Sequence, residues 1–253
     1  MASISVAVVT YNSENVIEEM LNTLLLSSVN IESSVYVIDN GSTDNTCNII
    51  KDKFPQICLI EQENKGFGGG HNAVLDRLTS TYHAIINPDI LLRENTLELL
   101  AQFMDDNPDV GLCTPLVLNP DGTHQEVPKR EPKYRYLVSR ELERFGGPFT
   151  KWRDEYTRRK EDLSVPTDVE FCTGCFMFIR TELFKKLGGF DERFFLYCED
   201  ADLTKRVLQE ARVVYFPDAE AVHRWERGSS HNRKLFFMHV KSMQQYFRKW
   251  RKR

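Results

Sequence analysis

Short β-branched runs alternate with stretches of helical spacing over the first 115 residues. Apolar residues recur at helical spacing over residues 16–25 and 91–104, the second stretch with Asn95 or Thr96 as its cap. The expected strands are Ile4–Thr10, Val35–Ile38, Ile57–Ile60, His83–Ile86 and Val110–Pro115. This alternation predicts βαβ units, and therefore an α/β fold with a central, mostly parallel sheet flanked by helices on both faces.

The residues that follow four of these strands are polar or glycine. Ligands of such sheets bind at the carboxyl ends of the strands. Each of the segments taken alone is compatible with a turn or a helix cap. Together they predict a single cleft, lined by Thr10-Tyr11-Asn12, Asp39-Asn40-Gly41-Ser42, the glycine-rich residues 64–72 and Asn87-Pro88-Asp89.

Composition excludes several classes of protein. With 253 residues, 41% hydrophobic and 28% charged, the chain suits one large soluble domain, or one domain with a small appendage. No apolar run is long enough to span a membrane, and the N-terminus lacks the pattern of a secretory signal. A net charge of −4 argues against a nucleic-acid partner. The six scattered cysteines suit reduced thiols in a cytoplasmic protein. These patterns leave the oligomeric state open.

The second half of the chain is less regular. Residues 129–165 are charged, aromatic and weakly periodic, and we interpret them as a variable insertion over the cleft. After an apolar block at Val169–Arg180, a helix is expected from Cys198 to about Glu210. Two further strands are expected at Arg212–Pro217 and Ala221–Trp225.

Two short motifs suggest chemistry that their context disfavours. Residues 68–73 match G-x-G-x-x-G/A, with an acid about twenty residues on, as in dinucleotide-binding folds. Here, however, two strand–helix units precede the glycines, which favours a glycine loop close to another phosphate or a sugar. Residues 172–175 form C-x-x-C, but no second pair completes a zinc site, so packed thiols are expected.

Three acidic positions and one histidine could carry chemistry. Asp89 could bind Mg²⁺ or Mn²⁺ together with diphosphate oxygens, or simply cap a turn. His223, at the end of an apolar run, could complete the metal shell or contact a phosphate, although a lone histidine is usually structural. Glu199 and Asp200 could stabilise a helix N-terminus, or one could be a general base. Asp202 makes this acidic cluster larger than capping requires.

The last twenty residues, Lys234–Arg253, contain seven Lys or Arg and no acid. Phe236, Val240, Met243, Phe247 and Trp250 recur at spacings of three and four residues, which predicts an amphipathic helix. A helix docked on the core would explain the apolar stripe. The terminal basic cluster favours, in addition, contact with an anionic membrane surface.

Motifs along nearly the whole chain resemble, in this order, those of the family 2 glycosyltransferases of GT-A fold. They are VVTYNSE (8–14), VIDNGSTDNT (37–46), NKGFGGGHN (64–72), INPD (86–89), CTGCFMFIR (172–180), GGFDERFFLYCEDADL (188–203) and VHRWERGSS (222–230). The NPD form and the long block around residues 195–203 are most similar to bacterial rhamnosyltransferases that build O-antigen and related surface polysaccharides.

The resemblance implies a division of the chain and a role for each motif. Residues 1–230 would form the GT-A domain, with a nucleotide-binding half (1–115) and an acceptor half (116–230) that contains the insertion 129–165. Residues 231–253 would form the basic helix. The implied donor-binding residues are Thr10, Tyr11, Asn12, Asp39, Asn64, Gly66, Gly68, Asn87 and Asp89, with Asp39 accepting from the pyrimidine N–H. Cys172, Thr173 and Gly174 would lie on the acceptor side.

The same resemblance implies the chemistry. Asp200, beside Glu199, would be the general base, and Asp89 with His223 would hold a divalent metal, Mg²⁺ or Mn²⁺. Asn87 replaces the first acid of the family's D-x-D motif, which weakens the requirement for metal. The implied reaction is inverting transfer of L-rhamnose from dTDP-β-L-rhamnose to a saccharide linked to polyprenyl diphosphate, at the inner face of the bacterial membrane. The alternatives are transfer of galactose, N-acetylglucosamine or fucose from a UDP, dTDP or GDP donor and, with less support, a dehydrogenase or a non-catalytic sugar-binding protein.

Overall fold

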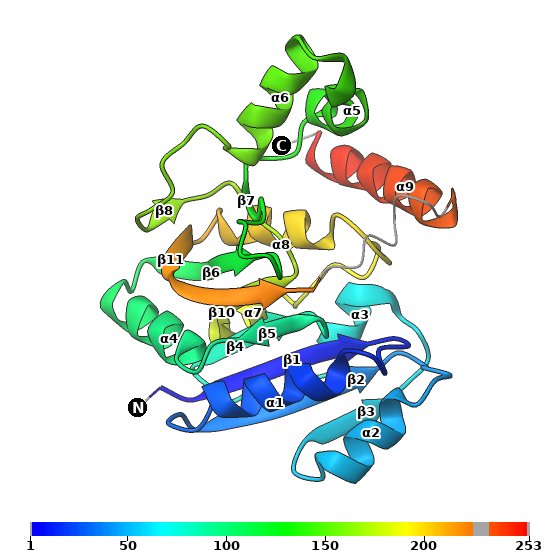
Figure 1. Ribbon diagram of the computed structural model, residues 1–253, viewed down its shortest axis with the longest axis vertical. Helices are drawn as coiled ribbons and strands as arrows, with labels where there is room; N and C mark the ends of the chain where they lie inside the picture. The colour runs from blue at the N-terminus through cyan, green and yellow to red at the C-terminus, as the bar shows by residue number, and fades with distance from the viewer. Residues whose placement is uncertain (1, 225–232, 252–253) are drawn as a thin grey trace.

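A nine-stranded sheet forms the centre of the protein (Figure 1). The computed structural model describes residues 2–224 and 233–251. Its strand order is β3-β2-β1-β4-β10-β6-β11-β5, with β8 paired to β11. The strands are β1 (Ile4–Thr10), β2 (Ser33–Asp39), β3 (Cys58–Glu61), β4 (Tyr82–Ile86), β5 (Ile90–Leu92), β6 (Val110–Leu118), β8 (Thr167–Asp168), β10 (Phe176–Arg180) and β11 (Arg212–His223).

The first half of the sheet has the expected parallel order. Strands β3, β2, β1 and β4 are parallel neighbours, and β6 is parallel to β11. Strands β5, β8 and β10 run against these neighbours. A separate two-stranded ladder pairs β7 (Pro128–Lys129) with β9 (Phe171–Cys172). The α/β fold class predicted from the strand–helix alternation is therefore confirmed.

Helices cover both faces of the sheet, because the strands are apolar on both sides. On one face α1 (Ile17–Ser27), α2 (Thr46–Lys53) and α4 (Thr96–Asp106) enclose one hydrophobic cluster. On the other face α7 (Thr181–Lys186) and α8 (Glu199–Val207) enclose a second cluster, next to α3 (Gly66–Asn72) and the short 3-10 helix η1 (Leu75–Arg77). This packing places the N-terminus of α8 beside the ends of the central strands.

Two local expectations need correction, and a third is untested. The two strands expected after residue 212 are one strand, β11, whose pairing with β6 skips between Phe216 and Glu220. Pro217 falls in that gap, where the lack of an N–H is tolerated. Leu91, expected in a helix, lies in β5, and α4 begins only at Thr96. Trp225, the expected end of the last strand, lies outside the described residues.

The insertion is largely helical. It contains α5 (Tyr134–Leu142), the 3-10 helix η2 (Glu143–Phe145) and α6 (Pro148–Thr157), which lie together at one end of the molecule (Figure 1). Ion pairs of Arg153 and Arg159 with Glu126 and Glu143 tie its two ends together. The weak periodicity of the segment reflects polar contacts of this kind in place of an apolar helix face.

The C-terminal helix α9 (Arg233–Trp250) is docked on the protein along one side. Tyr246 and Trp250 are buried in a small cluster with Phe171, Phe194 and Ala201. Within the described chain, no helix has the length and apolarity needed to cross a bilayer. The predicted amphipathic helix is therefore present, and the core accounts for part of its apolar stripe.

Candidate active site

The loops that follow β1 and β2 are joined by side-chain hydrogen bonds. The buried Thr10 donates to the Asp39 carboxylate at 3.0 Å, and the N–H groups of Gly41 and Ser42 donate to its second oxygen. Asp39 therefore holds its own loop in shape. Its predicted contact with a pyrimidine N–H stays a prediction.

Tyr11 and Asn12 lie at the rim of this region. The Tyr11 side chain is 56% exposed, so its ring is available to a ligand. Asn12 adopts φ 52°, a left-handed conformation that Asn tolerates better than most residues. Its side-chain oxygen accepts from the Thr43 N–H at 2.8 Å, which links the loops after β1 and β2.

The glycines of α3 permit close packing. Gly66 has φ +77°, and a Cβ there would lie 2.0 Å from the carbonyl oxygen of Phe195. Asn64 caps this turn by accepting from the Gly66 N–H at 2.9 Å. A Cβ on Gly68 would lie 2.8 Å from that of Phe190. This packing accounts for the glycines without a ligand, and it fixes the loop before α8.

Asp200 stands at the start of α8, behind a strained turn. Tyr197 and Cys198 are both left-handed, with φ 70° and 68°, a conformation typical of functional sites. The half-buried Asp200 accepts from the N–H of Gly174 at 3.0 Å and from that of Ala201 at 2.8 Å. Its carboxylate is thus held by two backbone donors, as expected for a base of fixed orientation.

The two adjacent acids differ in their surroundings. Burial raises the pKa of Asp200, and the N–H groups of Gly174 and Ala201 and the Lys129 ammonium oppose that rise. Burial and the Asp200 charge raise the pKa of Glu199 well above its usual value. Within the described residues, one carboxyl oxygen of Glu199 has no hydrogen-bond partner. We infer that Glu199 is the neutral acid and Asp200 the carboxylate, which makes Asp200 the better candidate for a base.

Asp89 and His223 face each other across the end of the sheet. Nε2 of His223 lies 3.2 Å from Oδ1 of Asp89. On the other side of the ring, Gln125 accepts from Nδ1 at 2.9 Å and returns a hydrogen bond to the His223 carbonyl at 3.1 Å. Although burial alone would lower it, hydrogen bonds to Asp89 and Cys175 raise the pKa of His223 to about 10.

The turn between β9 and β10 brings the two acidic positions into one site. Gly174 donates to Asp200, and the next residue, Cys175, accepts from the Asn87 N–H at 3.0 Å and lies beside His223. Asp200 and Asp89 therefore flank the same turn. Thr173 lies on it as well, with its hydroxyl 3.4 Å from the Cys175 sulfur.

One expected site residue fails on burial, and one acid of the α8 cluster turns away from the other two. Cys172 is fully buried, so its thiol belongs to the core and cannot contact an acceptor. Asp202 is also fully buried, and its side chain contacts α9. There it contacts Arg206 at 2.8 Å, Lys249 at 2.5 Å and the Trp250 indole N–H at 3.0 Å. The third acid of the cluster thus anchors the C-terminal helix.

The Asp89–His223 pair can hold a divalent cation only together with other ligands. No cluster of three or more His, Cys, Asp or Glu side chains suited to a metal occurs among the described residues. Within that set, the buried Oδ1 of Asp89 has no hydrogen-bond donor other than His223. One carboxylate and one imidazole fit Mn²⁺ or Mg²⁺ if the imidazole gives up its Nε2 proton and if diphosphate oxygens and water supply the remaining ligands.

Sequence reasoning missed Gln125 and Lys129. Gln125 precedes the insertion and Lys129 is its first residue; neither belongs to a motif, so no local signal marks them. Gln125 orients His223, 98 positions away. Lys129 lies over the rings of Tyr156 and Phe171, and its charge acts on Asp200. Only their place in the fold identifies them.

Comparison with known proteins assigns the chain to a protein family. The model of glycosyl transferase family 2 matches residues 5–188, and the chain therefore belongs to that family and is a glycosyltransferase. An N-acetylglucosaminyl-diphospho-decaprenol L-rhamnosyltransferase of Mycobacterium tuberculosis is 28% identical over 233 residues, which cover 86% of this chain and 75% of the relative. The rhamnosyltransferase WbbL of Escherichia coli is 38% identical over 89 residues, 34% of each chain.

Solved structures show the same fold. A mannosyltransferase of Pyrobaculum calidifontis, determined with GDP-mannose and Mn²⁺, superposes with a TM-score of 0.65 at 21% identity, over 98% of this chain and 64% of that one. TarS of Staphylococcus aureus superposes with a TM-score of 0.62 at 20% identity, over 87% of this chain. This chain spans 60% of that TarS structure. The GT-A fold expected from the motifs is confirmed.

Proposed function

We propose that the protein transfers L-rhamnose from dTDP-β-L-rhamnose to a hydroxyl of a saccharide acceptor, with inversion at the anomeric carbon. The observation that carries this proposal is the oriented carboxylate of Asp200, across the Gly174–Cys175 turn from the Asp89–His223 pair. The rhamnosyltransferase names of two relatives support the choice of sugar.

Asp200 removes the proton from the acceptor hydroxyl as that oxygen attacks the anomeric carbon. Its raised pKa makes it a stronger proton acceptor than an ordinary carboxylate, while Lys129 and two backbone N–H groups keep it ionised in the resting site. The buried Glu199 does not compete for the proton because it already carries one. A single displacement opposite the diphosphate inverts the anomeric centre, so the product is an α-rhamnoside.

In this proposal the leaving diphosphate lies beside the Asp89–His223 pair. A divalent cation bound there would offset the negative charge that develops on the leaving group. His223 presents Nε2 to the same position because Gln125 holds its ring. Thr10, Tyr11, Asn12 and Asp39 would hold the nucleoside.

The donor and its base are tested by transfer assays with dTDP-rhamnose, UDP-N-acetylglucosamine and GDP-mannose, each with and without Mn²⁺. We expect turnover with dTDP-rhamnose, and we expect Asp200→Asn to lose several orders of magnitude in kcat while still binding donor. Glu199→Gln is the matched control, since it replaces a neutral acid by a neutral amide of the same shape, and should lose far less. Near-normal turnover of Asp200→Asn would exclude the assigned base.

A second donor has support of its own. The poly(ribitol-phosphate) β-N-acetylglucosaminyltransferase TarS is 31% identical over 147 residues, 55% of this chain and 26% of TarS, and a TarS structure contains UDP-N-acetylglucosamine. Preferential use of UDP-N-acetylglucosamine in the same panel would replace rhamnose in the proposal and leave the role of Asp200 intact.

We also propose that the acceptor is linked to polyprenyl diphosphate and that the protein works at the inner, cytoplasmic face of the membrane. The name of the mycobacterial relative includes a diphospho-decaprenol acceptor. On α9 the side chains of Phe237, Lys241 and Arg248 are exposed, and each basic residue near anionic lipid adds about 1 kcal/mol to binding. Lys249 and Trp250 are already engaged with Asp202 and contribute less.

Membrane contact is tested with phosphatidylglycerol vesicles. Removing residues 244–253 would also remove Tyr246 and Trp250 from the core, so reversal of exposed charges is the cleaner change. The double variant Lys241→Glu/Arg248→Glu should cosediment with vesicles much less than the unaltered protein. Lys51→Glu on α2 is the control. Equal cosedimentation of all three proteins would remove α9 from the membrane contact.

A further inference from the structure

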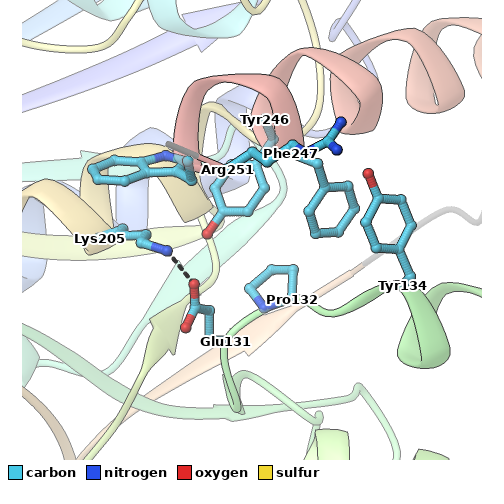
Figure 2. A pocket seen from close by; sticks show the side chains of 8 residues that line it. Glu131, Pro132, Tyr134, Lys205, Tyr246, Phe247 and Arg251 are labelled. Carbon is cyan, nitrogen blue, oxygen red and sulfur yellow. Dashed lines mark hydrogen bonds and ion pairs between the residues drawn. The ribbon is translucent and has the colours of Figure 1, made fainter. Parts of the chain in front are cut away.

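A pocket of about 290 Å³ lies at the C-terminal end of α9, between this helix, α8 and the segment that follows β7 (Figure 2). We call it the α9 pocket. None of the catalytic or donor-binding residues named above lines it. Its lining residues are Glu131, Pro132, Tyr134, Lys205, Tyr246, Phe247, Trp250 and Arg251.

Aromatic rings form much of its wall. Tyr134 and Phe247 stack with their centroids 3.9 Å apart, which ties the start of the insertion to α9. Tyr246 packs edge-on against Phe247 at 5.5 Å. The Trp250 indole is fixed by its hydrogen bond to Asp202. The wall is therefore formed by rings held in place before any ligand binds, the usual character of a small-molecule site.

One polar group in the pocket lacks a partner. Tyr246 is 2% exposed, and within the described residues its hydroxyl has no hydrogen-bond partner. In Figure 2 the hydroxyl points toward the side of the pocket where Glu131 and Lys205 form an ion pair. A buried hydroxyl left unpaired costs about 1–3 kcal/mol, which a ligand that bonds to it would recover.

The polar groups suit a neutral polyol better than an anion. Glu131 accepts hydrogen bonds, Lys205 and Arg251 donate them, and the Tyr246 hydroxyl can do both. Sugar hydroxyls likewise donate and accept, and the C–H faces of a pyranose ring pack on aromatic rings. A diphosphate would meet the Glu131 carboxylate, which already pairs with Lys205 and leaves Arg251 as the remaining charge of the lining. The pocket thus matches the chemistry of a sugar ring.

The pocket lies further along α8 than the proposed base. Lys205 follows Asp200 by five residues on α8, a rise of about 7.5 Å along the helix axis. Glu131 follows Lys129 by two residues, and the Lys129 charge acts on Asp200. An oligosaccharide whose terminal hydroxyl reaches Asp200 could therefore place a preceding ring against α9.

We propose that the α9 pocket binds a pyranose ring of the saccharide acceptor, next to the sugar whose hydroxyl Asp200 deprotonates. This inference rests on the proposed function for its ligand class. It assigns to the insertion and to α9 a shared role in choosing the acceptor, since Tyr134 comes from one and Phe247 from the other.

The test is ligand-observed saturation-transfer NMR with the full chain and Mg²⁺. The probes are the methyl glycosides of rhamnose, glucose, galactose and N-acetylglucosamine, and separately inorganic pyrophosphate, which is followed by phosphorus NMR. Excess dTDP and UDP block the nucleotide site. We expect at least one glycoside to bind under these conditions. Tyr246→Phe should weaken that binding about fivefold, the worth of one hydrogen bond.

Two further variants make the result specific. Tyr134→Ala removes a ring that is 68% exposed, so folding is not at risk, and should weaken the same glycoside. Phe237→Ala, on α9 but outside the pocket, should leave binding unchanged. The proposal is overturned if no glycoside binds, if Tyr246→Phe and Tyr134→Ala bind as the unaltered protein does, or if these variants lose pyrophosphate binding in place of glycoside binding.

Asp200→Asn separates this proposal from the proposed function. The variant should keep glycoside binding while it loses transfer. If it keeps both, the assigned base is wrong and the pocket stands. If glycoside binding is absent from every protein while Asp200→Asn still abolishes transfer, the pocket is wrong and the transferase mechanism stands.

Discussion

Replacing Gly66 by alanine tests whether the glycine helix α3 positions the base. An alanine Cβ at this position would lie 2.0 Å from the Phe195 carbonyl oxygen, whereas real Cβ contacts stay beyond 3.0 Å. The carbonyl must therefore retreat by about 1 Å. That carbonyl also accepts from the Phe67 N–H at 3.0 Å, so the shift weakens the bond that joins α3 to the loop before α8.

The expected magnitudes follow from this geometry. A left-handed alanine costs about 1–2 kcal/mol. The weakened hydrogen bond adds about 1 kcal/mol. A total of about 3 kcal/mol lowers the Tm of a chain of this length by about 6–12 °C. Because Phe195 precedes Asp200 by five residues, the shift also displaces the base, and a displacement of about 1 Å costs about 100-fold in kcat.

Gly122 supplies the matched control. It has φ +82°, and a Cβ there would meet nothing within 4 Å. Gly122→Ala should therefore lose only the backbone cost of about 1–2 kcal/mol and keep its kcat. Thermal unfolding and donor consumption are measured for both variants. If Gly66→Ala keeps the kcat of the unaltered protein and unfolds with Gly122→Ala, the positioning role of α3 is refuted.

Three other changes have defined outcomes. Asp202→Asn leaves the Lys249 ammonium with one acidic partner fewer in a buried pair, which should cost about 3–5 kcal/mol and lower Tm by about 10 °C in a thermal melt; a shift of 1–2 °C would contradict this. Burial lowers the pKa of His83 from 6.5 to about 3, so below pH 6.5 the unfolded chain binds the proton more readily than the folded chain. The free energy of unfolding therefore decreases as the pH is lowered. From pH 7 to pH 5 His83 contributes a loss of about 2 kcal/mol in urea titrations, and His83→Gln should lose about that much less than the unaltered protein. Part of the loss should remain, because burial also lowers the pKa of His71; an equal loss in both proteins would place the acid sensitivity elsewhere. Gln125→Leu frees the His223 ring and should weaken Mn²⁺ binding by about 10–100-fold in calorimetric titration with dTDP present, and an unchanged titration would remove Gln125 from the site.

Local patterns were sufficient for much of the fold. The alternation of apolar periods predicted the parallel half of the sheet, and the start of α8 was predicted within one residue. Polar residues after successive strands indicated a cleft before any packing was known, because parallel strands end on the same edge of a sheet. Where strands joined the sheet out of chain order, as β5 and β10 do, period alone gave no guide to their neighbours.

The residues of the candidate site fall into two groups, those that the sequence marks and those that only the fold reveals. Asp89, Asp200 and Asn12 could be singled out because each follows a recognisable strand or opens a helix. Their partners could not, because a contact between residues 98 positions apart leaves no trace in either local segment. Gln125 and Lys129 are ordinary polar residues until the fold sets them against His223 and Asp200.

The amino-acid sequence by itself determined the α/β class, the polar loops at the ends of the strands and the amphipathic character of the last helix. These features depend on turn chemistry and periodicity. Tertiary packing decided which way each side chain points. It turned Asp202 toward α9, packed the α3 glycines closely against the loop before α8, and placed Trp250 in the core. Burial and charge act through space, and therefore only the folded chain separates Asp200, the proposed base, from Asp202, which holds α9.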